Sequence, residues 1–112
     1  MAKKSIDSAV LERLFEKIKS HRKGDPKTSY SAKLFAKGRG KITQKLGEEA
    51  VETIIAALEG SSKEVAAESA DMLYHLLALW VETGVKPGDV WSELARREGV
   101  SGLDEKKSRS KN

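Results

Sequence analysis

The segment that most constrains the fold of this chain runs from Met72 to Val81. It reads MLYHLLALWV, and apart from His75 it is apolar on nearly every side of the helix that it would form. A helix on the surface of a globular protein needs only one apolar stripe. This segment therefore predicts either a central helix of a bundle or a contact between subunits. It is too short to cross a bilayer, which takes about 20 residues.

The remaining sequence also favours helices. Apolar residues recur at spacings of three and four, glycine and proline separate the repeating segments, and no β-type alternation is present. A chain of 112 residues with 38% apolar and 34% charged residues fits one domain. We expect an all-α, four-to-five-helix bundle spanning 1–112, with a helical core over about 5–99 and a basic, flexible tail over 100–112. The expected helices cover residues 5–21, 28–37, 41–59, 61–84 and 87–98.

Charge and cysteine content narrow the function classes. The net charge is +4 and the chain has no cysteine, which excludes disulfides and thiolate zinc sites. Much of the positive excess lies between Lys106 and Lys111, as expected of a solvated terminus. No signal peptide or apolar membrane span is recognisable. We therefore expect a cytoplasmic protein that binds neither nucleic acid nor a membrane.

Five carboxylates occupy two helices that should be neighbours. Glu48, Glu49 and Glu52 lie on one expected helix, and Glu68 and Asp71 lie at i and i+3 on the next. A short turn makes the two helices antiparallel neighbours, so the two acidic stripes can face each other across one groove. Carboxylates at short range raise each other's pKa unless a cation lies between them. Oxygen ligands favour Mg²⁺, with Mn²⁺ as a substitute. The alternative is that these are two solvated helix faces.

A substrate with several phosphates would also need cations outside the metal site. Four candidates lie before or at the start of the acidic helix and two lie in the last helix: Lys37, Arg39, Lys41, Lys45, Arg96 and Arg97. The alternative for each is a solvated surface base. For Lys45 it is also an ion pair with Glu48 or Glu49 on its own helix.

The motif Glu-Glu-x-x-Glu at 48–52, followed by Glu-x-x-Asp at 68–71, resembles the signature of the MazG-like all-α nucleoside-triphosphate pyrophosphohydrolases. Three longer stretches resemble one branch, the phosphoribosyl-ATP pyrophosphohydrolase family: SYSAKLFAKGRGKITQKLGEEAVETIIAA, ESADMLYHLLAL and ELARREGVSGLDEKKSR. The resemblance extends from about Ile6 to Arg109. Because the chain has two histidines and no cysteine, it is similar to the stand-alone form rather than to the fusions with a cyclohydrolase.

This resemblance implies Mg²⁺-dependent hydrolysis of 1-(5-phosphoribosyl)-ATP to 1-(5-phosphoribosyl)-AMP and pyrophosphate, the second step of L-histidine biosynthesis. It assigns the five carboxylates as metal ligands and catalytic groups without choosing the base among them. One alternative is a house-cleaning pyrophosphohydrolase that acts on other nucleotides. Another is a non-catalytic helical module that oligomerises and binds nucleic acid. We also expect a homodimer or higher oligomer through Met72 to Val81, because a chain this short leaves much of that helix uncovered.

Overall fold

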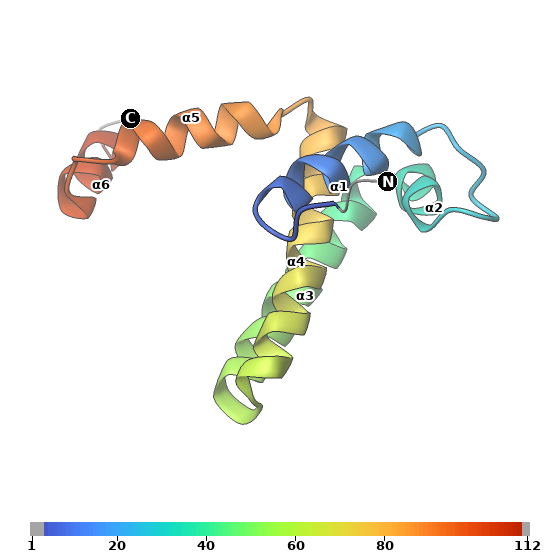
Figure 1. Cartoon of the computed structure of the whole chain (residues 1–112), viewed down its shortest axis with the longest axis horizontal. Helices are drawn as coiled ribbons and strands as arrows, with labels where there is room; N and C mark the ends of the chain where they lie inside the picture. The colour runs from blue at the N-terminus through green and yellow to red at the C-terminus, as the bar shows by residue number, and fades with distance from the viewer. Residues whose placement is uncertain (1–3, 111–112) are drawn as a thin grey trace.

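The computed structural model describes residues 4–110, and the regular structure in that range is entirely α-helical. The all-α prediction is confirmed, with one helix more than the four to five expected. Figure 1 shows the helices in chain order: α1 (Ala9–Ser20), α2 (Tyr30–Lys37), α3 (Arg39–Glu59), α4 (Ser62–Thr83), α5 (Pro87–Arg97) and α6 (Gly102–Ser110).

The helix ends follow local signals that are readable in the sequence. The Ser61 side chain accepts a hydrogen bond from the Glu64 amide and caps α4, which ends at Gly84 in the left-handed region, at φ +77°. Pro87 is the first residue of α5. α1 begins at Ala9, later than expected, and the Asp7 carboxylate just before it accepts a hydrogen bond from the Ala9 amide at 2.9 Å.

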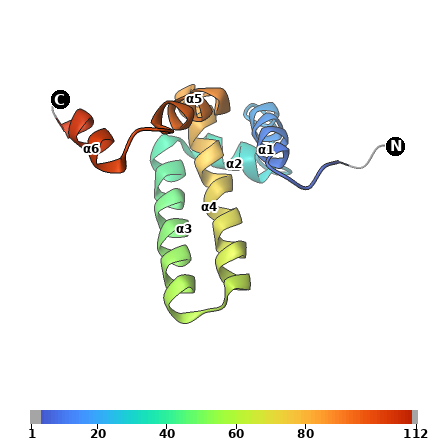
Figure 2. The same ribbon diagram turned by 60° about the vertical axis from the view of Figure 1, so that its left-hand side comes forward.

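The centre of the molecule is the hairpin of α3 and α4. These two helices run antiparallel and side by side along most of their length (Figures 1 and 2). α1 packs against α4, and α2 packs against α3, both near the end of the hairpin that is away from the α3–α4 turn. The buried core lies where these four helices meet, and its residues are Phe15, Ile18, Leu34, Ile42, Leu77, Ala78 and Val81.

The other end of the hairpin has little apolar cover within the described residues. On α3, Ile54 is 58% exposed and Leu58 is 80% exposed, and Val51 and Ile55 are also exposed. The radius of gyration is 16.4 Å, whereas a compact domain of this length has one of about 13 Å. On α4, by contrast, most of the apolar run is buried or partly buried by its own chain, and Leu73 is its exposed apolar residue. The largest uncovered apolar surface of the hairpin therefore lies on α3 rather than on α4.

Helix α6 lies in the segment that we expected to be a tail. Ser101 accepts a hydrogen bond from the Asp104 amide at 3.0 Å and caps the helix, and Glu105 is buried with three arginine partners. The Glu105 carboxylate lies 2.7 Å from Arg96 and 3.4 Å from Arg109, and Arg97 is the third partner. The sequence prediction counted the cations from Lys106 to Lys111 and left out Glu105, the acid just before them, which pairs with Arg109 and with two arginines of α5. Lys111 lies outside the described residues, and flexibility of the segment stays a prediction.

Over residues 4–110, none of the helices combines the length and the apolar character that crossing a membrane would require. The expected cytoplasmic location stays a prediction.

Candidate active site

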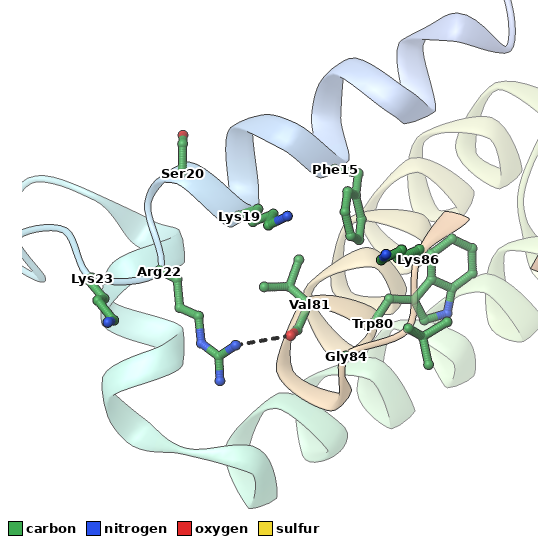
Figure 3. Close-up of a pocket in the computed structure, with 10 residues that line it drawn as sticks. Phe15, Lys19, Ser20, Arg22, Lys23, Trp80, Val81, Gly84 and Lys86 are labelled. Atoms are coloured by element: carbon green, nitrogen blue, oxygen red, sulfur yellow. Dashed lines mark hydrogen bonds between the residues drawn. The ribbon is translucent and has the colours of Figure 1, made fainter. Parts of the chain in front are cut away.

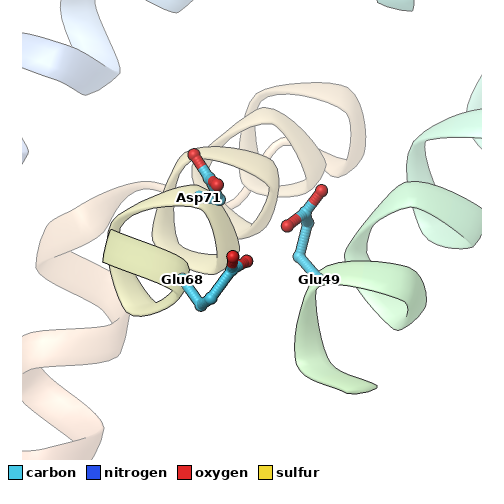
Figure 4. Close-up of side chains that lie close together, drawn as sticks. All are labelled: Glu49, Glu68 and Asp71. Carbon is cyan, nitrogen blue, oxygen red and sulfur yellow. The ribbon is translucent and has the colours of Figure 1, made fainter. Parts of the chain in front are cut away.

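Three of the five predicted carboxylates converge between α3 and α4. Glu49 on α3 faces Glu68 and Asp71 on α4, as Figure 4 shows. One carboxylate oxygen from each residue lies within 4.8 Å of those of the other two. The short turn at Gly60 and Ser61 places the two helices in contact, and the spacing of i and i+3 puts both α4 residues on the side that faces Glu49. The predicted acidic groove is therefore present in the structure.

The carboxylates of this group lack hydrogen-bond donors. The Oε2 atoms of Glu48, Glu49 and Glu68 are shielded from water and accept no hydrogen bond from the residues that the structure describes. A buried oxygen without a donor is costly, and for an ionised carboxylate the cost is larger still. A hard divalent cation bound by oxygen atoms would remove this cost. The donor set therefore fits Mg²⁺ or Mn²⁺.

Burial and neighbouring acids both raise the pKa values of two carboxylates in the groove. Burial raises the pKa of Glu49, and the carboxylates of Glu52 and Asp71 raise it further. Burial also raises the pKa of Glu68, followed by contact with Glu52 and the charge of Asp71. Glu52 therefore raises the pKa of a carboxylate on each side of the groove, Glu49 on α3 and Glu68 on α4. It also lines a hollow with Glu49 and a second hollow with Glu68.

Glu48 lies at the edge of the groove, where the acidic side chains of α3 adjoin a basic one. Its Oε2 atom is 4.0 Å from the Lys45 ammonium, three residues earlier on α3. The ion pair that we gave as the alternative role of Lys45 is therefore present, although its two charged groups are far apart for an ion pair. The alternative of solvated carboxylates holds for Glu52 and Asp71, which are exposed, and not for Glu48, Glu49 and Glu68, which are partly buried.

A hydrogen-bonded chain ties α2 to the acidic groove. The Nδ1 atom of buried His75 is 2.9 Å from the backbone oxygen of Asp71, and the Nε2 atom is 3.1 Å from the Tyr30 hydroxyl. A carbonyl oxygen only accepts, so Nδ1 carries the proton, and in the neutral ring Nε2 accepts from Tyr30. Sequence reasoning left Tyr30 out of the candidate site, although the Ser29-Tyr30 pair was part of the family resemblance.

A hollow of about 220 Å³ lies beside the acidic groove and is lined by lysines. We call it the lysine hollow, and its lining residues are Tyr30, Lys33, Leu34, Lys37, Lys41 and Lys45. It brings together three of the predicted substrate-binding cations and adds Lys33, which sequence reasoning missed. No carboxylate lines it. Lys45 also lines the hollow that contains Glu48 and Glu49, so the basic and acidic sites adjoin along α3.

Residues 11–98 match the family model described as phosphoribosyl-ATP pyrophosphohydrolase. The chain belongs to this family. The matched residues include all five carboxylates and the four cations of the lysine hollow. The prediction of family membership is confirmed, and belonging to a family of hydrolases supports an enzyme over a non-catalytic module.

Individual relatives agree with the family match over nearly the whole chain. A protein of Paramagnetospirillum magneticum named phosphoribosyl-ATP pyrophosphatase is 62% identical over 105 residues, covering 94% of this chain and 96% of the relative. One of Azospirillum brasilense with the same name is 52% identical and covers 97% and 98%. A third, of Gluconobacter oxydans, is 57% identical and covers 91% and 77%.

The three predicted arginines lie apart from the lysine hollow in this phosphoribosyl-ATP pyrophosphohydrolase family member. The Arg39 guanidinium is 3.5 Å from the backbone oxygen of Glu82 near the end of α4. Arg96 and Arg97 form hydrogen bonds with Glu93 and hold the pKa of that carboxyl down at about 2. Both lie on α5, which extends away from the hairpin (Figure 1). A role of the three arginines in substrate binding stays a prediction.

Another hollow, of about 390 Å³, lies between α1 and the end of α4 (Figure 3). Its wall is mainly apolar, with Phe15, Trp80 and Val81, and lysines stand at its rim. Arg22 there donates a hydrogen bond to the backbone oxygen of Val81 at 3.1 Å. No carboxylate lines this hollow, so it lacks the oxygen ligands for a divalent cation. The acidic groove, rather than this apolar hollow, is the candidate active site of the family member.

Proposed function

We propose that this chain hydrolyses 1-(5-phosphoribosyl)-ATP to 1-(5-phosphoribosyl)-AMP and pyrophosphate with Mg²⁺, the second step of L-histidine biosynthesis. The observation that carries the proposal is the set of buried carboxylate oxygens without donors in the groove of Glu49, Glu68 and Asp71. A lysine hollow beside that groove suits a phosphate-rich substrate. The names of the relatives support the same substrate.

The reaction breaks one phosphoanhydride bond. A water oxygen bonds to one of the two phosphorus atoms that share the α–β bridging oxygen, and the bond from that phosphorus to the bridging oxygen breaks. When bound in the groove, Mg²⁺ neutralises phosphate charge and lowers the pKa of a water molecule. Glu49, Glu68 and Asp71 would hold the cation, with Glu48 and Glu52 at its margins. One carboxylate of the five accepts the proton that the water loses.

Lys45 has a distinct place in this scheme because it borders both sites. It lines both the lysine hollow and the hollow of Glu48 and Glu49. An ammonium group is a compact charge with three donors and binds phosphate oxygen without a fixed fork geometry. Lys45 would therefore hold the phosphates in position beside the carboxylates.

The proposed activity is tested by measuring pyrophosphate release from phosphoribosyl-ATP, ATP and dUTP, each with Mg²⁺, with Mn²⁺ and with EDTA. We expect release from phosphoribosyl-ATP with either cation and none with EDTA. Release from ATP or dUTP but not from phosphoribosyl-ATP would support the house-cleaning alternative. No release from any of the three would contradict a catalytic role.

We also infer a homodimer or higher homo-oligomer, with its contact on the exposed apolar face of α3. The sequence reading expected the contact on α4, but much of that helix's apolar surface is buried by its own chain. Replacing Ile54 and Leu58 with glutamate is expected to reduce the mass in solution to that of a monomer, because burying the new charges is costly. Light scattering at micromolar concentration measures this mass. Leu103→Glu, on exposed α6, is the control that leaves the mass unchanged, and a monomeric wild type would contradict the inference.

A further inference from the structure

We propose that the lysine hollow binds the ribose 5-phosphate group that phosphoribosyl-ATP carries on its adenine, and so distinguishes this substrate from ordinary nucleoside triphosphates. The inference rests on the proposed function and adds a specificity site to it. By its chemistry, phosphoribosyl-ATP has phosphate at two ends, a triphosphate and a phosphate monoester, with adenosine between them. ATP and dUTP have only the triphosphate end.

The charges of the hollow suit a phosphate monoester. Lys33 and Lys37 project from α2, and Lys41 and Lys45 project from α3, into a space of about 220 Å³. Lys33, Lys37 and Lys41 form no ion pair with any residue in the range 4–110, and Lys45 has only the 4.0 Å contact with Glu48. Three ammonium groups without an ion pair in this range and a fourth with one long contact create a strongly positive site, which a phosphate dianion would neutralise.

Helix α3 sets the distance between this hollow and the acidic groove. Lys41, Lys45 and Glu49 follow one another at intervals of four residues and therefore lie along one face of the helix. The rise from Lys41 to Glu49 is about 12 Å. One face of α3 is thus basic in its first two turns and acidic near its middle. A substrate with phosphate at two ends matches this order, with the triphosphate at the carboxylates and the monoester at the lysines.

The hydrogen bond between Tyr30 and His75 links the lysine hollow to the acidic groove and fixes their relative position. Tyr30 lines the lysine hollow, and its hydroxyl reaches His75, whose ring is bonded to the backbone of Asp71 in the groove. Burial raises the pKa of Tyr30, so its hydroxyl keeps the proton that this bond needs. The hollow on α2 and α3 is therefore anchored to the same turn of α4 that carries the carboxylate.

The inference is tested by calorimetric binding of the product phosphoribosyl-AMP in comparison with AMP, which lacks the ribose 5-phosphate. We expect the wild type to bind phosphoribosyl-AMP on the order of 10- to 100-fold more tightly, as charge-assisted hydrogen bonds to one phosphate provide. The double variant Lys33→Gln, Lys37→Gln should lose most of this preference and show a higher KM for phosphoribosyl-ATP. The double variant Lys27→Gln, Lys63→Gln removes the same charge from exposed positions outside the hollow and should keep the preference.

The outcomes separate this inference from the proposed function. An unchanged preference in the Lys33 and Lys37 variant, or an equal loss of AMP and phosphoribosyl-AMP binding, would overturn the specificity site while pyrophosphate release by the wild type leaves the function standing. No pyrophosphate release from phosphoribosyl-ATP by the wild type would overturn both. Far-ultraviolet circular dichroism checks that each variant is folded.

Discussion

Replacing Glu49 with glutamine is expected to lower kcat/KM for phosphoribosyl-ATP by about 10³-fold at saturating Mg²⁺. The change keeps the shape of the side chain and removes its charge from a group whose oxygens lie within 4.8 Å of those of Glu68 and Asp71. Charge stabilisation by a bound cation contributes several kcal/mol in the transition state, and 1.36 kcal/mol corresponds to a factor of ten. Steady-state pyrophosphate release measures the effect.

A matched control lies on the same helix. Glu59 is an exposed residue near the end of α3 and outside the groove, so Glu59→Gln should keep wild-type activity. Asp71→Asn removes a second charge from the groove and should lose activity as Glu49→Gln does. Wild-type turnover in both Glu49→Gln and Asp71→Asn would contradict the assignment of the groove as the metal site.

The Glu49→Gln variant, which should lose activity, should be more stable to heat than the wild type at neutral pH when no divalent cation is present. The pKa of Glu49 is raised in the folded state above its ordinary value of 4.5, so the folded state binds the proton more tightly than the unfolded state. This group therefore destabilises the fold as pH rises from below 4.5 through the raised pKa. Without divalent cation, Glu49→Gln should melt above the wild type at neutral pH and close to it at low pH. Added Mg²⁺ should stabilise the wild type more than the variant.

Replacing Leu77 with alanine is expected to cost about 2–5 kcal/mol of the free energy of unfolding. Leu77 is 1% exposed and lies in the core where α4 meets the other helices, so the truncation leaves a cavity that its neighbours fill only in part. A domain of this size has a total stability of about 5–15 kcal/mol, so the loss is a large part of it. Chemical denaturation at one fixed protomer concentration measures the effect, because association also contributes to stability.

The control for Leu77→Ala is the same substitution at an exposed position. Leu103 on α6 is 77% exposed, and its replacement by alanine should change the free energy of unfolding by less than about 0.5 kcal/mol. Equal losses for the two variants would contradict the position of the core.

Local patterns in the sequence predicted much of the architecture and part of the site. Helix ends at Ser61, Gly84 and Pro87 depend on side-chain caps and backbone preferences within a few residues, so they are visible without the fold. The acidic groove was also predictable, because a short turn between two long helices forces Glu49 to face Glu68 and Asp71. Helix α6 was not predicted, because its buried Glu105 depends on arginines from another helix.

The sequence by itself determined the all-α class and the five candidate carboxylates, which follow from periodicity, turn length and motif spacing. It also determined the family, through the resemblance of its longer stretches to known members. Only the tertiary structure decided which basic side chains line the same hollow. It placed Lys33 beside the three predicted lysines, directed Arg39 to the end of α4, and joined Tyr30 to His75 across two helices. The tertiary structure also put the uncovered apolar face on α3. The physical reason is that such contacts depend on how whole helices cross and pack, which no local spacing specifies.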